Sequence, residues 1–204
     1  CSALGVGLTA PTLARHAQWG AHHAVCASAE ETYACGAPGI AIGAFTASKL
    51  VELGDTVWLV ARGRPVRFLH WYHHASVLAF CWLALARRTG MVGLWFGTIN
   101  MAVHAVMYAY YALQAQARGA PRWVRRCARA ITLLQICQMV AGAALVAAAG
   151  AFMLSGVPCA LDPHVAGAGA LMYASYGVLF VRFYRSAYPR ATGPRDVHPV
   201  VKTL

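Results

Sequence analysis

Charged residues, and acidic ones above all, are scarce in this sequence. Only 11% of its 204 residues are charged, whereas 59% are hydrophobic, and Asp and Glu together number six. A soluble domain usually carries about 25% charged residues, so the composition excludes an ordinary soluble protein. The formal net charge of +11 would suggest nucleic acid in a soluble protein. Here most basic residues fall between apolar runs. Orientation of the protein in the membrane is therefore the first explanation of the charge, and binding of an anionic substrate is the second. We expect no nucleic acid partner.

The sequence also lacks the patterns of several other architectures. It shows no apolar–polar alternation over segments of about ten residues, which argues against a transmembrane β-barrel. It has no repeats of solenoid period and no low-complexity tract. Its seven cysteines do not make a disulfide framework, because Cys81 and Cys137 lie within apolar runs. Long apolar runs remain, so the predicted fold class is all-α, a polytopic membrane helical bundle.

About five complete transmembrane helices and a partial one are predicted. The chain opens with Cys1 in the middle of an apolar stretch, Ala3 to Leu13 broken by Pro11, which is interpreted as the tail of a membrane helix. We therefore expect N-terminal membrane segments to be missing. The complete helices are predicted at about 36–61, 68–86, 91–114, 130–154 and 167–187.

One domain accounts for these helices. Residues 1–188 are predicted to form a single transmembrane catalytic domain, and residues 189–204 a cytosolic tail. Residues 14–35 are polar, and loops run over the surface. We therefore expect a surface loop that contains His16, His22, His23, Glu30 and Glu31.

The basic residues lie unevenly between the two ends of the predicted bundle. Thirteen of the 17 Lys and Arg residues fall in 62–67, in 118–129 and from 182 onward. Lys and Arg are enriched in cytoplasmic loops, so these loops and the C-terminus are predicted to face the cytoplasm.

Polar residues recur inside the predicted spans at helical spacing. His70, His73 and His74 share one helical face, and so do Lys49 and Glu52, for which a purely structural buried ion pair is the simplest explanation. Asp55 follows Glu52 by three residues in the same run. A third stripe contains Asn100, His104, Tyr108 and Tyr111, and a fourth contains Thr132, Gln135 and Gln138. Because polar stripes cannot face lipid, we expect the four helices to turn them toward a common interior.

Three kinds of chemistry fit such an interior. A His-x-x-His-His box occurs in membrane di-iron desaturases and hydroxylases, but the spans offer only His70, His73, His74 and His104, too few for such a site, although a single zinc stays open. Alternatively, an imidazole can attack an activated acyl group and form an acyl-imidazole, or move protons. A proton-coupled transporter could use the charged residues and histidines as a relay, but no inverted halves are visible.

Four motifs, in order and at fitting spacing, resemble one family, the very-long-chain fatty acid elongases of the ELO type. The motifs are Lys49-x-x-Glu52-x-x-Asp55-Thr56, Phe68-Leu69-His70-x-x-His73-His74, Asn100-x-x-x-His104-x-x-Met107-Tyr108-x-Tyr110-Tyr111 and Thr132-x-x-Gln135-x-x-Gln138. The resemblance implies an endoplasmic reticulum enzyme with seven transmembrane helices, six of which ring a tunnel open to the cytosol. It implies condensation of a long-chain acyl-CoA with malonyl-CoA to 3-oxoacyl-CoA, CoA and CO2.

The resemblance also implies roles for individual residues. His73 is expected to carry the acyl group and His104 to assist condensation, with supporting roles for His70, His74, Asn100, Tyr108, Gln135 and Gln138. Substrate and CoA contacts are expected from Lys49, Glu52, Asp55, Arg62 and Arg185. The family often has a cysteine in each of two lumenal loops, so Cys26 and Cys159 are candidates for a disulfide.

The remaining expectations follow from the same resemblance. No tightly bound cofactor and no metal are implied, and acyl-CoA and malonyl-CoA are the substrates. Membrane lipid, the reductases and dehydratase of the elongation cycle, and a second copy in a homodimer are the expected partners. The first membrane helix and about half of the second are expected to be missing, which would leave the ring of six incomplete. The alternatives are a metal-dependent membrane lipid desaturase or hydroxylase, and a proton-coupled transporter.

Overall fold

The protein is built from helices. The structure, a computed structural model, describes residues 2–116 and 122–189. Within these ranges it contains no strand, so the all-α prediction is confirmed. The predicted cytosolic tail, from residue 190 on, lies outside the described residues. The helices are α1 (Ser2–Gln18), α2 (His23–Cys26), α3 (Ala29–Thr32), α4 (Gly36–Ala61), α5 (Phe68–Ala86), α6 (Met91–Gln116), α7 (Arg122–Leu154) and α8 (Pro163–Ala187).

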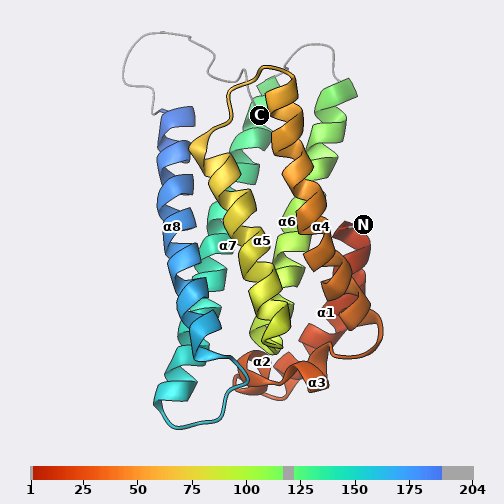
Figure 1. Cartoon of the computed structure of the whole chain (residues 1–204), viewed down its shortest axis with the longest axis vertical. Coiled ribbons are helices and arrows are strands. Elements are labelled where there is room, and N and C mark those ends of the chain that lie inside the picture. The colour runs from red at the N-terminus through yellow and green to blue at the C-terminus, as the bar shows by residue number, and fades with distance from the viewer. Residues whose placement is uncertain (1, 117–121, 190–204) are drawn as a thin grey trace.

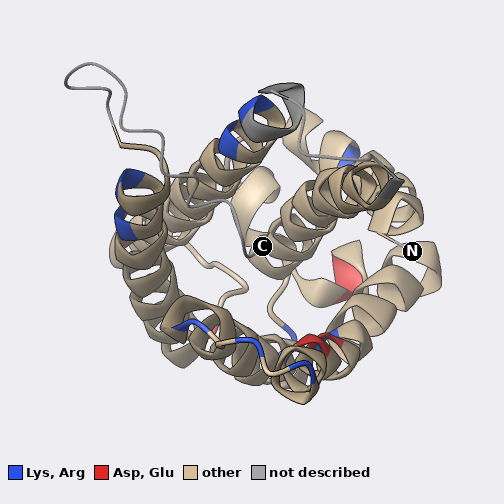
Figure 2. Ribbon diagram, turned by 90° about the horizontal axis from the view of Figure 1, so that it is seen from above, with Lys and Arg blue, Asp and Glu red and all other residues tan. Residues whose placement is uncertain are grey.

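Six of these helices pack into a ring. Each packs mainly on two neighbours, in the order α1, α4, α5, α8, α7, α6 and back to α1, and α4 also contacts α6. Figure 2 looks down the ring from one end. The sequence predicted an incomplete ring of six. Helix α1 occupies the sixth position, but it has 17 residues where α4 and α6 have 26 each. It therefore closes only the lower part of the ring in the view of Figure 1.

Three helices of the described chain are long and apolar enough to cross a membrane, within Met91–Ala115, Arg126–Leu154 and Pro163–Ala187. Helices α4 and α5 run beside them in the same ring (Figure 1). Their spans contain polar residues, Lys49, Glu52 and Asp55 in α4 and the three histidines in α5. Such residues lower the hydropathy by which a membrane span is recognised.

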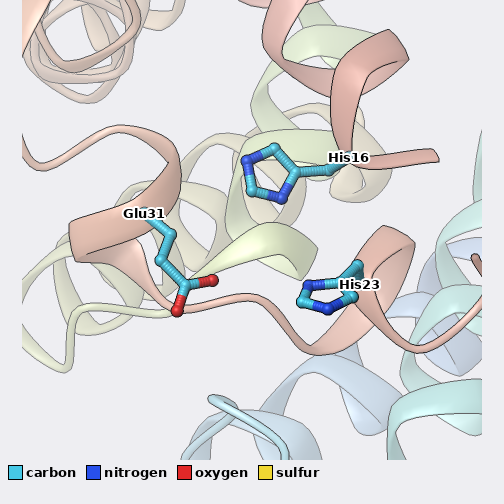
Figure 3. Close-up of side chains that lie close together, drawn as sticks. All are labelled: His16, His23 and Glu31. Carbon is cyan, nitrogen blue, oxygen red and sulfur yellow. The ribbon is translucent and has the colours of Figure 1, made fainter. Parts of the chain in front are cut away.

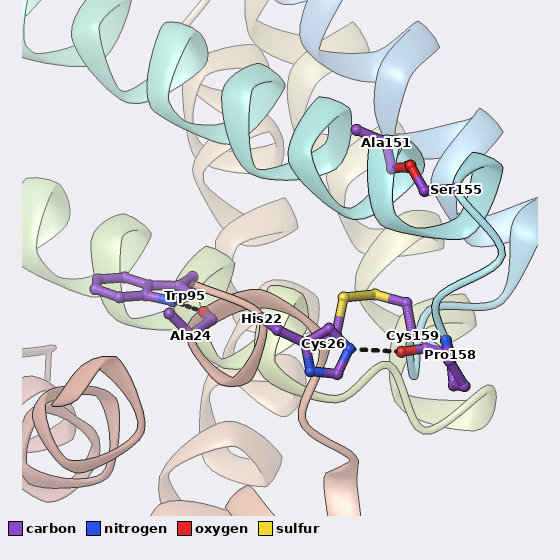
Figure 4. Close-up of a disulfide and its surroundings, with 8 residues drawn as sticks. All are labelled: His22, Ala24, Cys26, Trp95, Ala151, Ser155, Pro158 and Cys159. Carbon is purple, nitrogen blue, oxygen red and sulfur yellow. Dashed lines mark hydrogen bonds between the residues drawn. A yellow bond between two sulfur atoms is a disulfide. The ribbon is translucent and has the colours of Figure 1, made fainter. Parts of the chain in front are cut away.

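The end of the ring that holds α2 and α3 is cross-linked covalently. A disulfide joins Cys26 to Cys159, which are 133 residues apart in sequence and 4.4 Å apart between Cα atoms (Figure 4). Beside it, the backbone N–H of Ala160 donates to the carbonyl of Cys26 at 3.0 Å. The turn before α6 passes so close that a Cβ at Gly90 would collide with the carbonyl of Ala27. The segment between α1 and α4 is therefore fixed to the α7–α8 connection.

The prediction of a surface loop over residues 14–35 is wrong in part. Helix α1 continues through Pro11 to Gln18, and His16 is only 1% exposed. The physical reason is the packing of α1 on α6, where the hydroxyl of Thr98 donates to that of Thr9 at 2.8 Å. His23, Glu30 and Glu31 are exposed, as predicted.

Two further helices begin earlier than predicted. Helix α7 starts at Arg122 rather than near 130, so most of the predicted basic linker is helical. Helix α8 starts at Pro163 rather than 167, because Asp162 caps it. The Asp162 carboxylate accepts hydrogen bonds from the N–H groups of His164 and Val165, and Pro163 in the first turn lacks an N–H to satisfy.

Candidate active site

A buried lysine links α4 to α6 inside the ring. The Lys49 ammonium donates to Glu52 Oε1 at 2.7 Å and to Asn100 Oδ1 at 3.1 Å. All three residues are buried, and the ammonium lies 4.4 Å from the centroid of the Phe45 ring. A buried charge is tolerated when it is paired and hydrogen-bonded, and this lysine meets both conditions. The polar stripes of α4 and α6 therefore meet in the interior.

The three box histidines lie in the first turns of α5. His74 Nδ1 lies 3.9 Å from Glu52 Oε2, so the box reaches the charged pair on α4. The ring centroids of His70 and His73 lie 4.5 Å and 5.4 Å from that of His74. In the described part of the chain, His74 Nδ1, Glu52 Oε2 and His70 Nε2 are buried atoms without a hydrogen-bond partner. Buried polar atoms nearly always have partners, so this cluster has unused capacity for a polar ligand or water.

Helix α8 supports His73 through a tyrosine. The Tyr176 hydroxyl donates to the backbone carbonyl of His73 at 3.2 Å and lies 2.7 Å from Ser76 Oγ. Its ring centroid is 4.9 Å from that of His73, and Tyr176 is 2% exposed. Roles for Tyr176 and Ser76 were not predicted from the sequence, because a hydroxyl in an apolar helix resembles ordinary packing. The available signal was Ser76, which follows His73 by three residues and so shares its helical face.

A groove of about 440 Å³ runs between α1, α4 and α6. This volume is in the range of small-molecule sites. Its apolar lining includes Leu4, Leu8 and Ile40, and its polar lining includes Lys49, Glu52, Asp55, Asn100, His104 and Tyr108. The rings of His104 and Tyr108 are in contact, with centroids 5.6 Å apart. Glu52 lines this groove and faces His74 of the box, so the box and the groove meet at Glu52.

The fourth stripe, on α7, joins this region only in part. Gln135 Nε2 lies 3.8 Å from Met107 Sδ on α6. Gln138 is buried on α7, whereas the Thr132 hydroxyl donates to the carbonyl of Ala128 in its own helix. Gln135 is therefore the member of this stripe that reaches across to a neighbouring helix.

The residues predicted to bind CoA do not form one surface. Lys49 and Glu52 are buried, whereas Asp55, Arg62 and Arg185 are exposed. Arg62 follows α4 and stacks on Trp58, 4.4 Å from the ring centroid, and Arg185 lies in the last turn of α8. Figure 2 shows basic residues, in blue, at helix ends and along the α4–α5 connection at this end of the ring. Basic residues are therefore gathered at the end of the ring that lies opposite the disulfide.

The box histidines do not form a ready-made metal site. In residues 2–116 and 122–189, one group has three metal-ligating atoms within 4.8 Å of one another, and it contains His16, His23 and Glu31 instead. The contacts that the structure gives the box join its imidazoles to one another, to the Glu52 carboxylate and to the Tyr176 ring.

Comparison with known proteins identifies the family of this chain. The model of the ELO family, described as the GNS1/SUR4 family, matches residues 1–196. The chain belongs to the ELO family. The chain is similar to "Very long chain fatty acid elongase 6" of Drosophila melanogaster, with 39% identity over 92% of this chain and 58% of that protein.

Trypanosome elongases give matches of the same strength. "Fatty acid elongase 3" of Trypanosoma cruzi is 42% identical over 82% of this chain and 55% of that protein. "Fatty acid elongase 3" of Trypanosoma brucei brucei is 37% identical over 96% of this chain and 63% of that protein. The ELO chain thus spans between about half and two thirds of the length of these relatives. No solved structure gives a significant match.

Proposed function

We propose that this ELO chain condenses a long-chain acyl-CoA with malonyl-CoA through an acyl-histidine on His73. The observation that carries the proposal is the placement of His73: its ring packs against those of Tyr176 and His74, and His74 faces Glu52 of the buried ion pair. The names of the relatives support fatty acid elongation over the desaturase and transporter alternatives.

In the first half-reaction, a ring nitrogen of His73 attacks the thioester carbonyl carbon of the acyl-CoA. The carbon–sulfur bond breaks, and CoA leaves as the thiol with the proton that the imidazole loses. The product is an acyl-imidazole, which is itself a good acyl donor. The apolar lining of the groove by Leu4, Leu8 and Ile40 offers a lipid chain a surface next to the polar region.

In the second half-reaction, malonyl-CoA loses CO2, and the electron pair of the broken carbon–carbon bond remains on its α-carbon. This carbanion attacks the acyl carbonyl, the carbon–nitrogen bond to His73 breaks, and 3-oxoacyl-CoA leaves. His104 returns a proton to the His73 nitrogen and recovers one from solvent, so the cycle consumes one proton overall. General acid–base transfer of this kind suits an imidazole near neutral pH.

The surrounding residues position the two histidines. The hydrogen bonds of Lys49 fix Asn100 and Glu52, and Glu52 in turn faces His74. Because the Lys49 ammonium is already paired, we assign it this positioning role. The exposed Arg62 and Arg185 are the proposed contacts for the phosphates of CoA.

The orientation in the membrane follows from the charges. We propose that the end with Arg62 and Arg185 faces the cytosol, together with the C-terminus, in the endoplasmic reticulum membrane. The disulfide between Cys26 and Cys159 then lies on the lumenal side, where oxidised cysteines persist. Cytosolic CoA substrates and other enzymes of the elongation cycle would meet the basic end.

A labelled malonyl-CoA assay tests the proposal. The detergent-solubilised chain would be incubated with a panel of acyl-CoAs, and 3-oxoacyl-CoA would be measured by mass spectrometry. We expect product from the wild type and none from His73→Ala, while the exposed His164→Ala variant keeps its activity as a matched control. Equal product from wild type and His73→Ala would refute the role of His73.

A further inference from the structure

We propose that His16, His23 and Glu31 form a binding site for a divalent metal ion of the zinc class at the disulfide-linked end of the ring. His16 lies near the end of α1, His23 begins α2, and Glu31 lies in α3. One ligand atom of each residue lies within 4.8 Å of the other two. Figure 3 shows a ring nitrogen of His16 facing the gap between the Glu31 carboxylate and the His23 ring.

His16, the buried member of the set, has a ring nitrogen that lacks a hydrogen-bond partner among the described residues. His16 is 1% exposed, and its Nδ1 atom is buried without a hydrogen-bond partner in the described part of the chain. Leaving a buried polar atom unpaired destabilises the fold, so native structures rarely leave one without a partner. A metal ion bound at this nitrogen would supply the missing partner.

The other two members are free to ligate. His23 and Glu31 are exposed, and within the described chain no hydrogen bond or ion pair engages the Glu31 carboxylate. The neighbouring Glu30 is occupied instead, because Arg88 donates to it at 2.6 Å. Glu31, the unpaired one of these two adjacent acids, is therefore the one that faces the histidines.

Small side-chain movements would complete the coordination. Zinc binds imidazole nitrogen at about 2.0–2.1 Å and carboxylate oxygen at about 2.0–2.2 Å, so ligand atoms around a tetrahedral ion are roughly 3.4 Å apart. His16 is fixed by burial, and the exposed side chains of His23 and Glu31 can approach it. The Trp19 ring lies 4.7 Å from His16 and 5.7 Å from His23 between centroids, so both imidazoles contact the same indole.

The ligand set selects the class of metal. Two imidazoles and one carboxylate suit zinc, copper or nickel, whereas calcium and magnesium prefer oxygen ligands. Three protein ligands leave a fourth position for water. A bound ion would tie α1 to α2 and α3, at the same end where the disulfide holds α2 to the α7–α8 connection. Since α1 forms one wall of the groove, the metal would hold that wall in place.

Zinc titration of the purified chain tests the site. The whole chain in detergent would be stripped with a chelator and titrated with Zn²⁺ against a chromophoric competitor, with Mg²⁺ as a second probe. We expect one Zn²⁺ per chain, a rise in the midpoint of thermal unfolding with Zn²⁺, and no effect of Mg²⁺. Mutating even outer-shell residues costs about 10–100-fold in metal affinity, so His23→Ala and Glu31→Gln should each weaken Zn²⁺ binding by at least about tenfold.

The controls separate this site from other zinc ligands of the chain. His23→Ala and Glu31→Gln change exposed side chains, so the fold should survive them, unlike a truncation of the buried His16. His164→Ala removes another exposed histidine and should leave Zn²⁺ affinity unchanged. Zn²⁺ bound by exposed thiols such as Cys35 and Cys137 would persist in both ligand variants. Undiminished binding in those variants, or no stoichiometric binding by the wild type, would overturn the proposal.

Discussion

Removal of the Lys49 ammonium would leave a carboxylate unpaired inside the ring. The Lys49–Glu52 pair is 2.7 Å apart, and its side chains are 2% and 10% exposed. Removing one partner of a buried ion pair costs about 3–5 kcal/mol, because the other charge stays buried without compensation. For a chain of 204 residues, this predicts that Lys49→Met lowers the midpoint of thermal unfolding by about 6–20 °C. The midpoint can be measured on the detergent-solubilised chain by circular dichroism.

A double variant distinguishes the unpaired charge from a simple packing defect. Glu52→Gln in the Lys49→Met background removes the stranded charge, so we expect it to recover much of the lost midpoint. The exposed pair of Arg88 and Glu30, 71% and 57% exposed, is the matched control. Arg88→Met should change the midpoint little, since exposed ion pairs contribute little. An unchanged midpoint in Lys49→Met, or a double variant less stable than the single one, would refute the reasoning.

Three further predictions follow from single contacts. The same disulfide is broken in Cys26→Ser, in Cys159→Ser and in the double variant. Each should therefore lose about 2–5 kcal/mol of stability in thermal unfolding, and the three losses should be equal; unequal losses would contradict this. Tyr176→Phe should cost about 1 kcal/mol and slow acyl transfer in the malonyl-CoA assay, because it removes the hydrogen bond to the His73 carbonyl. Tyr173→Phe, at a neighbouring buried position, should leave acyl transfer unchanged. Partial desolvation raises the pKa of Asp162, but hydrogen bonds from the His164 and Val165 N–H groups and from Arg87 outweigh it and place that pKa below its ordinary value. The stability that the ionised Asp162 gives to α8 should therefore be present at neutral pH and be lost as the pH falls through the folded pKa. Hydrogen exchange near 162–166 should show this acid sensitivity in the wild type and not in Asp162→Asn.

Helical spacing was sufficient to predict two of the ring helices and one buried ion pair. The bounds of α4 and α5 agree with the apolar runs 36–61 and 68–86, because turn residues flank both runs. The spacing of Lys49 and Glu52 also anticipated their ion pair. These features depend on contacts between residues three or four apart, which a sequence displays directly.

Contacts between distant helices could not be predicted in the same way. The burial of His16 depends on the packing of α1 against α6, about which residues 14–35 carry no local signal. The hydrogen bond from Tyr176 to His73 joins residues 103 apart. The early start of α8 is different, since Asp162 followed by Pro163 is a local N-cap signal that was overlooked.

The acyl-histidine at His73 is the central claim of the proposed mechanism. Incubation of the chain with a long-chain acyl-CoA alone, followed by proteolysis and mass spectrometry, tests it most directly. We expect release of CoA and an acyl mass on the peptide that contains His73, present in His164→Ala and absent in His73→Ala. Formation of 3-oxoacyl-CoA by a chain whose His73 never acquires that mass under trapping conditions would contradict the account.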